Sequence, residues 1–155
     1  MPFDRLIATV DEWAGRRGRG DVFAQTGPTP LIPRHIEWAR SLEPDAFRDK
    51  IDAARVVVGH AGMGTIISAL QAGKPVIVLP RLGSLRETRN DHQVATARYW
   101  GEHASVRAAM DESALIRELD RADDLGTQPK IMPTASDEMI HALRSFISAD
   151  ARVAG

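Results

Sequence analysis

The chain has 155 residues, no cysteine and a formal net charge of −1 at pH 7. This length suits a single domain with a substantial core, which we expect at residues 1–149, followed by a mobile tail at 150–155. The composition excludes disulfides and thiolate metal sites, gives no support for nucleic-acid binding, and contains no apolar run near the roughly 20 residues of a membrane span.

The chain before residue 56 predicts two helices and two short strands. They are a helix at 3–16, a strand at 22–25, a strand at 36–42 and a helix at 44–54. Apolar residues recur at helical spacing from Phe3 to Trp13, which indicates an amphipathic first helix. Trp38 should point inward from the second strand, and Pro44 suits the first turn of the second helix.

The middle of the chain predicts a compact strand–loop–helix–strand unit. Val56–Val58 is a short β-branched run typical of a buried strand, and Val76–Leu79 is a second apolar run. Between them, Gly59–Gly64 holds three glycines, Thr65 stands where a helix N-cap is expected, and Gly73 fits the end of the helix. Together these elements predict a right-handed βαβ unit.

Such a glycine loop ahead of a helix is a candidate phosphate site. Glycine lets the backbone approach a ligand closely, and the first helical N–H groups carry the positive end of the helix dipole. The spacing is GxxGxG, however, and neither the GxGxxG of dinucleotide folds nor the Walker lysine is present. The glycines alone therefore leave a phosphate site and a plain tight turn both open.

The remaining chain predicts a polar loop and further helices. The loop after Pro80 carries Arg81, Arg86 and Arg89 around Glu87. The later elements are a helix at 90–101 that buries Val94, Ala97 and Trp100, a weak strand at Val106, and helices at 111–122 and 134–149. This alternation predicts an α/β domain, with a Rossmann-like parallel sheet and helices on both faces.

One strand of such a sheet is missing from the predicted order. A doubly wound domain opens with a central strand, whereas this chain opens with a helix. We therefore expect an unfilled strand position beside Val56–Gly59, or another segment recruited into it. On this interpretation the natural product begins roughly a dozen residues upstream, or the chain is a truncated form.

Three motifs occur together between residues 59 and 96. They are His60-Ala61-Gly62-Met63-Gly64-Thr65, then Gly73-Lys74-Pro75 with Pro80, and then Asn90-Asp91-His92-Gln93. Together they resemble the C-terminal, UDP-sugar-binding domain of glycosyltransferase family 28, the MurG-like transferases. The residues around Ile66–Leu70, Pro80-Arg81 and Glu87–Gln93 are similar to PssE-type exopolysaccharide glycosyltransferase subunits.

The resemblance implies a half-enzyme. Family 28 transferases have two Rossmann-like domains, one for the donor and one for the acceptor, and PssE-type chains carry only the donor half of this GT-B fold. It implies a donor-binding subunit of a two-component inverting hexosyltransferase, which moves a sugar from a UDP-sugar to a lipid-linked saccharide acceptor in exopolysaccharide biosynthesis. The acceptor half would be a membrane-associated partner, which would hold a cytoplasmic chain at the inner face of the membrane.

The resemblance also assigns roles to matching residues. Its candidate donor-binding residues are His60, Gly62, Gly64, Thr65, Ser68, Arg81, Glu87, Asn90, His92 and Gln93. The first four match positions around the donor diphosphate, and His92 with Gln93 matches the pair that touches the donor sugar. Ser68 falls where many relatives place a glutamate that binds the ribose, so this sequence departs from that pattern.

Other interpretations of these residues stay open. His60 could be a buried capping histidine, Gln93 a surface helix residue, and a loop arginine could pair with Glu87 or a partner protein instead of a diphosphate. No general base is assigned, since relatives hold it on the acceptor side, and neither a metal nor a separate cofactor is required. The domain could also be a non-catalytic UDP-sugar-binding or regulatory module, or a dinucleotide binder.

Overall fold

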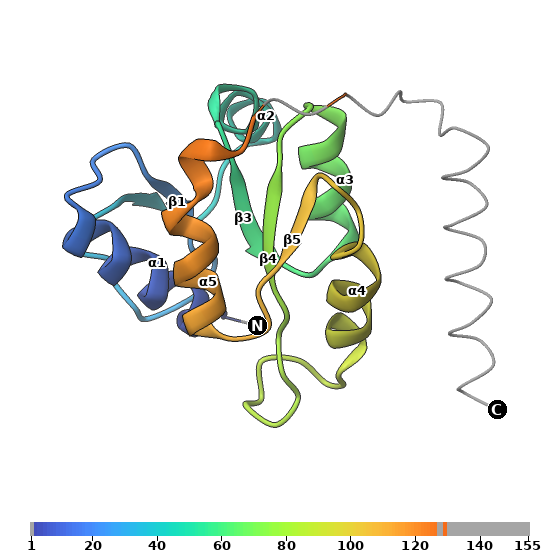
Figure 1. The fold of residues 1–155 in the computed structure, drawn as a ribbon. Coiled ribbons are helices and arrows are strands. Elements are labelled where there is room, and N and C mark those ends of the chain that lie inside the picture. Colours follow the sequence, from blue (N-terminus) through green and yellow to red (C-terminus); the bar gives the residue numbers. More distant parts are fainter. Residues whose placement is uncertain (1, 127–128, 130–155) are drawn as a thin grey trace, which may run out of the picture.

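The computed structural model describes residues 2–126 and residue 129, which form an α/β fold (Figure 1). Its elements are α1 (Asp4–Arg17), β1 (Phe23–Gln25), β2 (Glu37–Ala39), α2 (Pro44–Ala53), β3 (Val57–His60), α3 (Met63–Gln71), β4 (Val76–Leu79), α4 (His92–Trp100), β5 (Val106–Ala108), α5 (Glu112–Asp120) and the short 3-10 helix η1 (Ala122–Asp124). The helix predicted at 134–149 and the tail at 150–155 lie outside the described residues. None of the described helices is long and apolar enough to cross a membrane.

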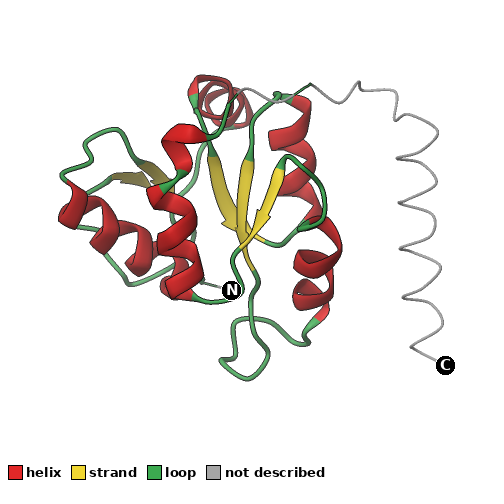
Figure 2. Ribbon diagram, viewed as in Figure 1, coloured by secondary structure: helices red, strands yellow, loops and turns green. Residues whose placement is uncertain are grey.

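The strands form two parallel sheets (Figure 2). In the larger sheet the order is β3–β4–β5, with Val76 of β4 opposite Val57 on one side and Val106 on the other. β1 and β2 form the smaller sheet. In the described part of the chain, β3 pairs with no strand on its other edge. The open position beside residues 56–59 agrees with the prediction from the sequence.

Each face of the larger sheet is covered by different helices (Figure 1). Ile77 and Leu79 point to one face and join a core with α1 and α5, whereas Val76 and Val78 join a second core with α3 and α4. All four side chains are fully buried, because a central parallel strand is covered on both faces and its residues alternate between them. The predicted Rossmann-like arrangement, with helices on both faces of a parallel sheet, is confirmed.

The start of α3 differs from the sequence prediction. Gly62 is the N-cap and the helix begins at Met63, so the prediction of Thr65 as the cap is wrong. Gly62 has extended backbone angles, φ −101° and ψ 137°, and its carbonyl accepts the Ile66 N–H at 3.2 Å. A glycine N-cap is well tolerated, and it moves the helix start toward the sheet.

Two predictions of side-chain burial also need correction. The fourth helix begins at His92, so Gln93 is buried while Val94 is only half-buried. Trp38 is half-buried as well, and Ile36, just before β2, is the buried side chain. The small β1–β2 sheet offers less cover than the central sheet, and this explains the partial exposure of Trp38.

Candidate functional site

Two loops open side by side at the carboxyl edge of the larger sheet. β3 ends at His60 and β4 at Leu79, and these two residues are paired in the parallel register. The first loop leads into α3, and residues 80–91 lead from β4 into α4. Open α/β sheets bind ligands at this edge. The fold therefore brings together predicted residues from two separate parts of the sequence.

The start of α3 leaves backbone N–H groups available to a ligand. Its N-cap, Gly62, has no side chain that could cap the first turn. Helix geometry leaves the N–H groups of Met63–Thr65 without an intrahelical partner, at the positive end of the dipole. A Cβ atom placed on Gly64 would meet no atom within 4 Å, so this residue borders open space. An anion can therefore approach the backbone closely here.

The other two glycines are required by close internal contacts. A Cβ atom on Gly59 would lie 2.7 Å from Cγ2 of Thr65, whose methyl group covers the end of β3. A Cβ atom on Gly62 would lie 2.0 Å from Cε1 of His60, so the imidazole rests directly on the Gly62 backbone. Positions 59 and 62 thus serve packing, and Gly64 is the glycine that a ligand can reach.

His60 carries a buried nitrogen without a hydrogen-bond partner. Its ring is half-buried, and Nδ1 has no partner in the described structure. Burial lowers the pKa of His60 below its usual 6.5, the charges of Arg81 and His92 lower this pKa further, and a hydrogen bond with Gln93 opposes them. At pH 7 the ring is therefore neutral, with one N–H donor and one acceptor nitrogen. A buried polar atom without a partner is uncommon in folded proteins outside functional sites.

Gln93 connects the two loops from the first turn of α4. Its side chain is 6% exposed. Oε1 accepts the backbone N–H of Arg81 at 3.2 Å, and the amide lies close enough to His60 to influence the pKa of its ring. The alternative that Gln93 is a surface helix residue is therefore wrong.

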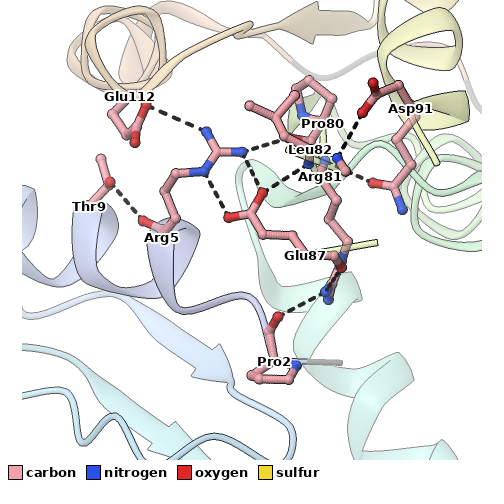
Figure 3. A network of polar contacts seen from close by, with 11 residues as sticks. Pro2, Arg5, Thr9, Pro80, Arg81, Leu82, Glu87, Asp91 and Glu112 are labelled. Atoms are coloured by element: carbon pink, nitrogen blue, oxygen red, sulfur yellow. Dashed lines mark hydrogen bonds and ion pairs between the residues drawn. The ribbon is translucent and has the colours of Figure 1, made fainter. Parts of the chain in front are cut away.

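Arg81 is held against Pro2 (Figure 3) and against the ring of Phe3. Its Nη1 donates to the carbonyl oxygen of Pro2 at 3.0 Å and to that of Glu87 at 3.1 Å. The guanidinium carbon also lies 4.7 Å from the centroid of the Phe3 ring. Burial lowers the pKa of Arg81 and the charge of Glu87 opposes this, yet arginine stays charged at physiological pH. Arg81 thus supplies a fixed positive charge next to His60.

The carboxylate of Glu87 is bound by Arg5, a residue outside the predicted site. Oε1 accepts from Arg5 Nε at 2.9 Å, and Oε2 accepts from Arg5 Nη2 at 2.9 Å and from the Leu82 N–H at 3.0 Å. Burial raises the pKa of Glu87, but these hydrogen bonds and the charges of Arg5 and Arg81 outweigh it, so the pKa lies below its usual 4.5. One prediction was that an arginine of the same loop pairs with Glu87. The arginine that binds its carboxylate is instead Arg5 of α1.

An open hollow of about 430 Å³ lies between the two loops. It is lined by His60, Arg81, Glu87, Thr88, Arg89, Asn90 and His92. Cationic and imidazole side chains outnumber the single carboxylate, which is already paired, so the hollow favours an anionic ligand. Asn90 hydrogen-bonds the ring of His92, and both are exposed.

The hollow divides the predicted site residues into two groups. Its walls contain five of them, whereas Gly62, Gly64, Thr65, Ser68 and Gln93 are outside its lining. Ser68 lies half-buried on the second turn of α3. Thr88 was not predicted, and Arg89 was considered only as one of three loop arginines that could pair with a diphosphate; the place of both between Glu87 and Asn90 is a signal for them. The described side chains include no group of three or more potential metal ligands.

Comparisons with known proteins point to one family. A family model described as the glycosyltransferase family 28 C-terminal domain matches residues 2–148. Among solved structures, the chain is similar to one described as "Crystal Structure Analysis of the Glycotransferase of kitacinnamycin", with a TM-score of 0.55 and 22% identity. The match covers 93% of this chain and 35% of that one, so this likeness concerns the fold of about a third of the larger protein. No curated protein matches the chain.

Proposed function

Because the chain belongs to the glycosyltransferase family 28 C-terminal domain family, we propose that it is the donor-binding subunit of a two-component inverting glycosyltransferase. The donor is a UDP-sugar, and the acceptor is a hydroxyl of a lipid-linked saccharide. The observation that carries this proposal is the open first turn of α3, which lies beside the His60 ring and a hollow with a cationic lining.

The diphosphate of the donor binds at the start of α3. Backbone N–H groups at Gly64 and Thr65 donate to the phosphate oxygens, and the dipole of α3 adds positive potential. The neutral ring of His60 donates one further hydrogen bond, and Arg81 supplies a full positive charge close by. No resident metal or cofactor is part of this proposal.

The sugar and the ribose of the donor contact other residues. We assign the sugar to His92 and Gln93, since a side-chain amide offers both donors and acceptors to hydroxyl groups. Asn90 holds the ring of His92 through a hydrogen bond. Ser68 takes the ribose position, where a hydroxyl stands in place of the glutamate of other family members.

Two chemical tasks are divided between two proteins. The leaving UDP gains negative charge as the glycosidic bond breaks, and the α3 N-terminus, His60 and Arg81 stabilise that charge. The acceptor hydroxyl needs a general base, which we place on an acceptor-domain partner. That partner is associated with the membrane and holds this chain at its cytoplasmic face, in a PssE-type system for exopolysaccharide synthesis.

Binding of the donor is the first test. Isothermal calorimetry with UDP, a panel of UDP-sugars and NAD should give measurable affinity for the uridine ligands and none for NAD. Preference for NAD would identify a dinucleotide binder and contradict the proposal.

Turnover is the second test. The purified chain with a UDP-sugar and lipid-linked acceptor should show little transfer, and addition of membranes that contain an acceptor-domain partner should restore it. Full turnover by the chain alone would contradict the division of labour. UDP-sugar binding without turnover in any combination would identify a non-catalytic binding module.

A further inference from the structure

The segment between β4 and α4 is held in place by a residue of α1 (Figure 3). Arg5, in the first turn of α1, is 82 positions before Glu87 in the sequence. Its guanidinium binds both carboxylate oxygens of Glu87 at 2.9 Å, the carbonyl of Pro80 at 2.8 Å and a carboxylate oxygen of Glu112 on α5 at 3.4 Å. One side chain therefore fixes the start of the segment and its centre to two helices.

Glu87 closes the turn at the tip of this segment. Its carboxylate accepts the Leu82 N–H at 3.0 Å, and its own N–H donates to the Leu82 carbonyl at 3.1 Å. Inside the turn, Arg86 has a φ of 58°, in the left-handed region that L side chains rarely adopt. A turn with such a residue is held by its surroundings, and the Arg5–Glu87 pair supplies the contacts from outside the segment.

Phe3 adds a second connection between α1 and the segment. The ring is 5% exposed, and the guanidinium carbons of Arg5 and Arg81 lie 5.4 Å and 4.7 Å from its centroid. Both side chains of the Arg5–Glu87 pair are also largely buried, at 12% and 11% exposed. The pair thus differs from an exposed surface salt bridge, which contributes little to a structure.

We propose that Arg5 is a positioning residue that holds residues 81–91 in the shape that forms the hollow. Arg5 itself does not line the hollow, whereas Glu87 and its neighbours do. Glu87 acts chiefly through its bond with Arg5, because three of the hydrogen bonds that its carboxylate can accept are already made within the protein. The ligand-binding consequence rests on the proposed function, but the effect on the segment does not.

Hydrogen exchange in the full chain tests the effect on the segment directly. Arg5→Gln and Glu87→Gln should accelerate exchange of the Leu82 and Glu87 amides by about fivefold or more, since these amides lose protection when the turn opens. Glu87→Gln keeps an oxygen that can accept the Leu82 N–H. Its effect therefore reports mainly the loss of the ion pair with Arg5. Arg5→Lys keeps the charge but loses the two-pronged contact, and its effect should be intermediate.

Arg17→Gln is the matched control. It removes another ion pair of α1, with Asp120 on α5, away from the segment. Melting temperatures and circular dichroism identify any variant that fails to fold. Unchanged exchange of residues 82–91 in a folded Glu87→Gln protein, or an equal increase in Arg17→Gln, would overturn the proposal.

UDP affinity separates the two proposals. If the wild-type chain binds UDP, Arg5→Gln should weaken UDP-sugar binding by about tenfold, and Arg17→Gln should leave it unchanged. Faster exchange in a chain that never binds UDP would retain the positioning role and reject the proposed donor. Faster exchange with unaltered UDP-sugar affinity would reject the link between this segment and ligand binding.

Discussion

Near His60 the backbone takes its shape from neighbours in the sequence, whereas residues 81–91 take their shape from a distant helix. The His60 ring rests on Gly62, and the Thr65 methyl group covers Gly59. The second loop depends on Arg5, which is 82 positions away from Glu87. The conformation of the first region therefore depends on side-chain volume and glycine geometry. The conformation of the second depends on an ion pair.

This difference implies that the two regions respond to different changes. Added volume should disturb the start of α3 and leave the second loop intact. Loss of a charge, or protonation of a carboxylate, should disturb the second loop and leave the glycine loop intact. Four experiments test that separation, in order of decreasing expected effect.

The largest effect is expected from the substitution Gly62→Val. Its Cβ atom would fall 2.0 Å from Cε1 of His60, so the ring or the helix start must move. Overpacking of this kind destabilises proteins by about 1–3 kcal/mol, and UDP affinity should fall as the α3 N-terminus is displaced. Urea unfolding and calorimetry with UDP measure the two losses.

Gly64→Val is the matched comparison for that substitution. No atom lies within 4 Å of the added Cβ, so the fold should tolerate valine with a melting temperature close to that of the wild type. UDP affinity should nevertheless fall by about tenfold or more, because the side chain blocks close approach to the backbone. Unchanged UDP affinity in folded Gly64→Val would place the diphosphate elsewhere.

A smaller effect is expected from Gln93→Ala, which removes the connection between the two regions. If Gln93 reads the donor sugar, affinity for the UDP-sugar should fall by about 1 kcal/mol or more while that for UDP stays nearly unchanged. Calorimetry with both ligands makes the comparison. Equal losses for the two ligands would instead show that Gln93 acts by orienting His60 and Arg81.

The smallest effect is expected from acidification, through Glu87. The pKa of Glu87 in the folded chain lies below its usual 4.5. As the pH falls, the unfolded chain therefore binds a proton at Glu87 before the folded chain does. The Arg5–Glu87 pair should therefore stabilise the fold fully above pH 4.5 and lose this contribution as pH falls through the lower pKa that Glu87 has in the folded chain. Urea unfolding at pH 7 and pH 4 should show a smaller pH effect in Glu87→Gln; an identical pH effect in both proteins would contradict the assignment.

Several features of the fold could be predicted because their causes are local. The glycine loop between Val56–Val58 and Val76–Leu79 predicted a strand–helix–strand unit, and β3, α3 and β4 confirm it. The cap of α5 is equally local, because the carboxylate of Asp111 accepts the Ala114 N–H at the start of the helix. The open edge of β3 in the described part of the chain also followed from the predicted order of elements. In each case a few neighbouring residues decide the local conformation.

Other features depended on contacts that the sequence does not display. A pattern can place Gln93 on a helix, but the packing of α4 against the sheet decides that its amide is buried between His60 and Arg81. The spacing of the glycines likewise does not predict that Gly62 is required for packing whereas Gly64 borders open space. The answer came from the distances around Gly62 and Gly64.

By itself, the sequence determined the order of elements, since hydrophobic spacing and glycines act over a few residues, and the family resemblance of its motifs named the candidate site residues. The tertiary structure decided which of those residues surround one hollow and which side chain holds them there. No local signal in the sequence pairs Arg5 with Glu87, because ion pairing requires proximity in space and the fold alone brings the first turn of α1 beside the loop after β4. The chemistry of the loop therefore depends on a residue that only the folded chain identifies.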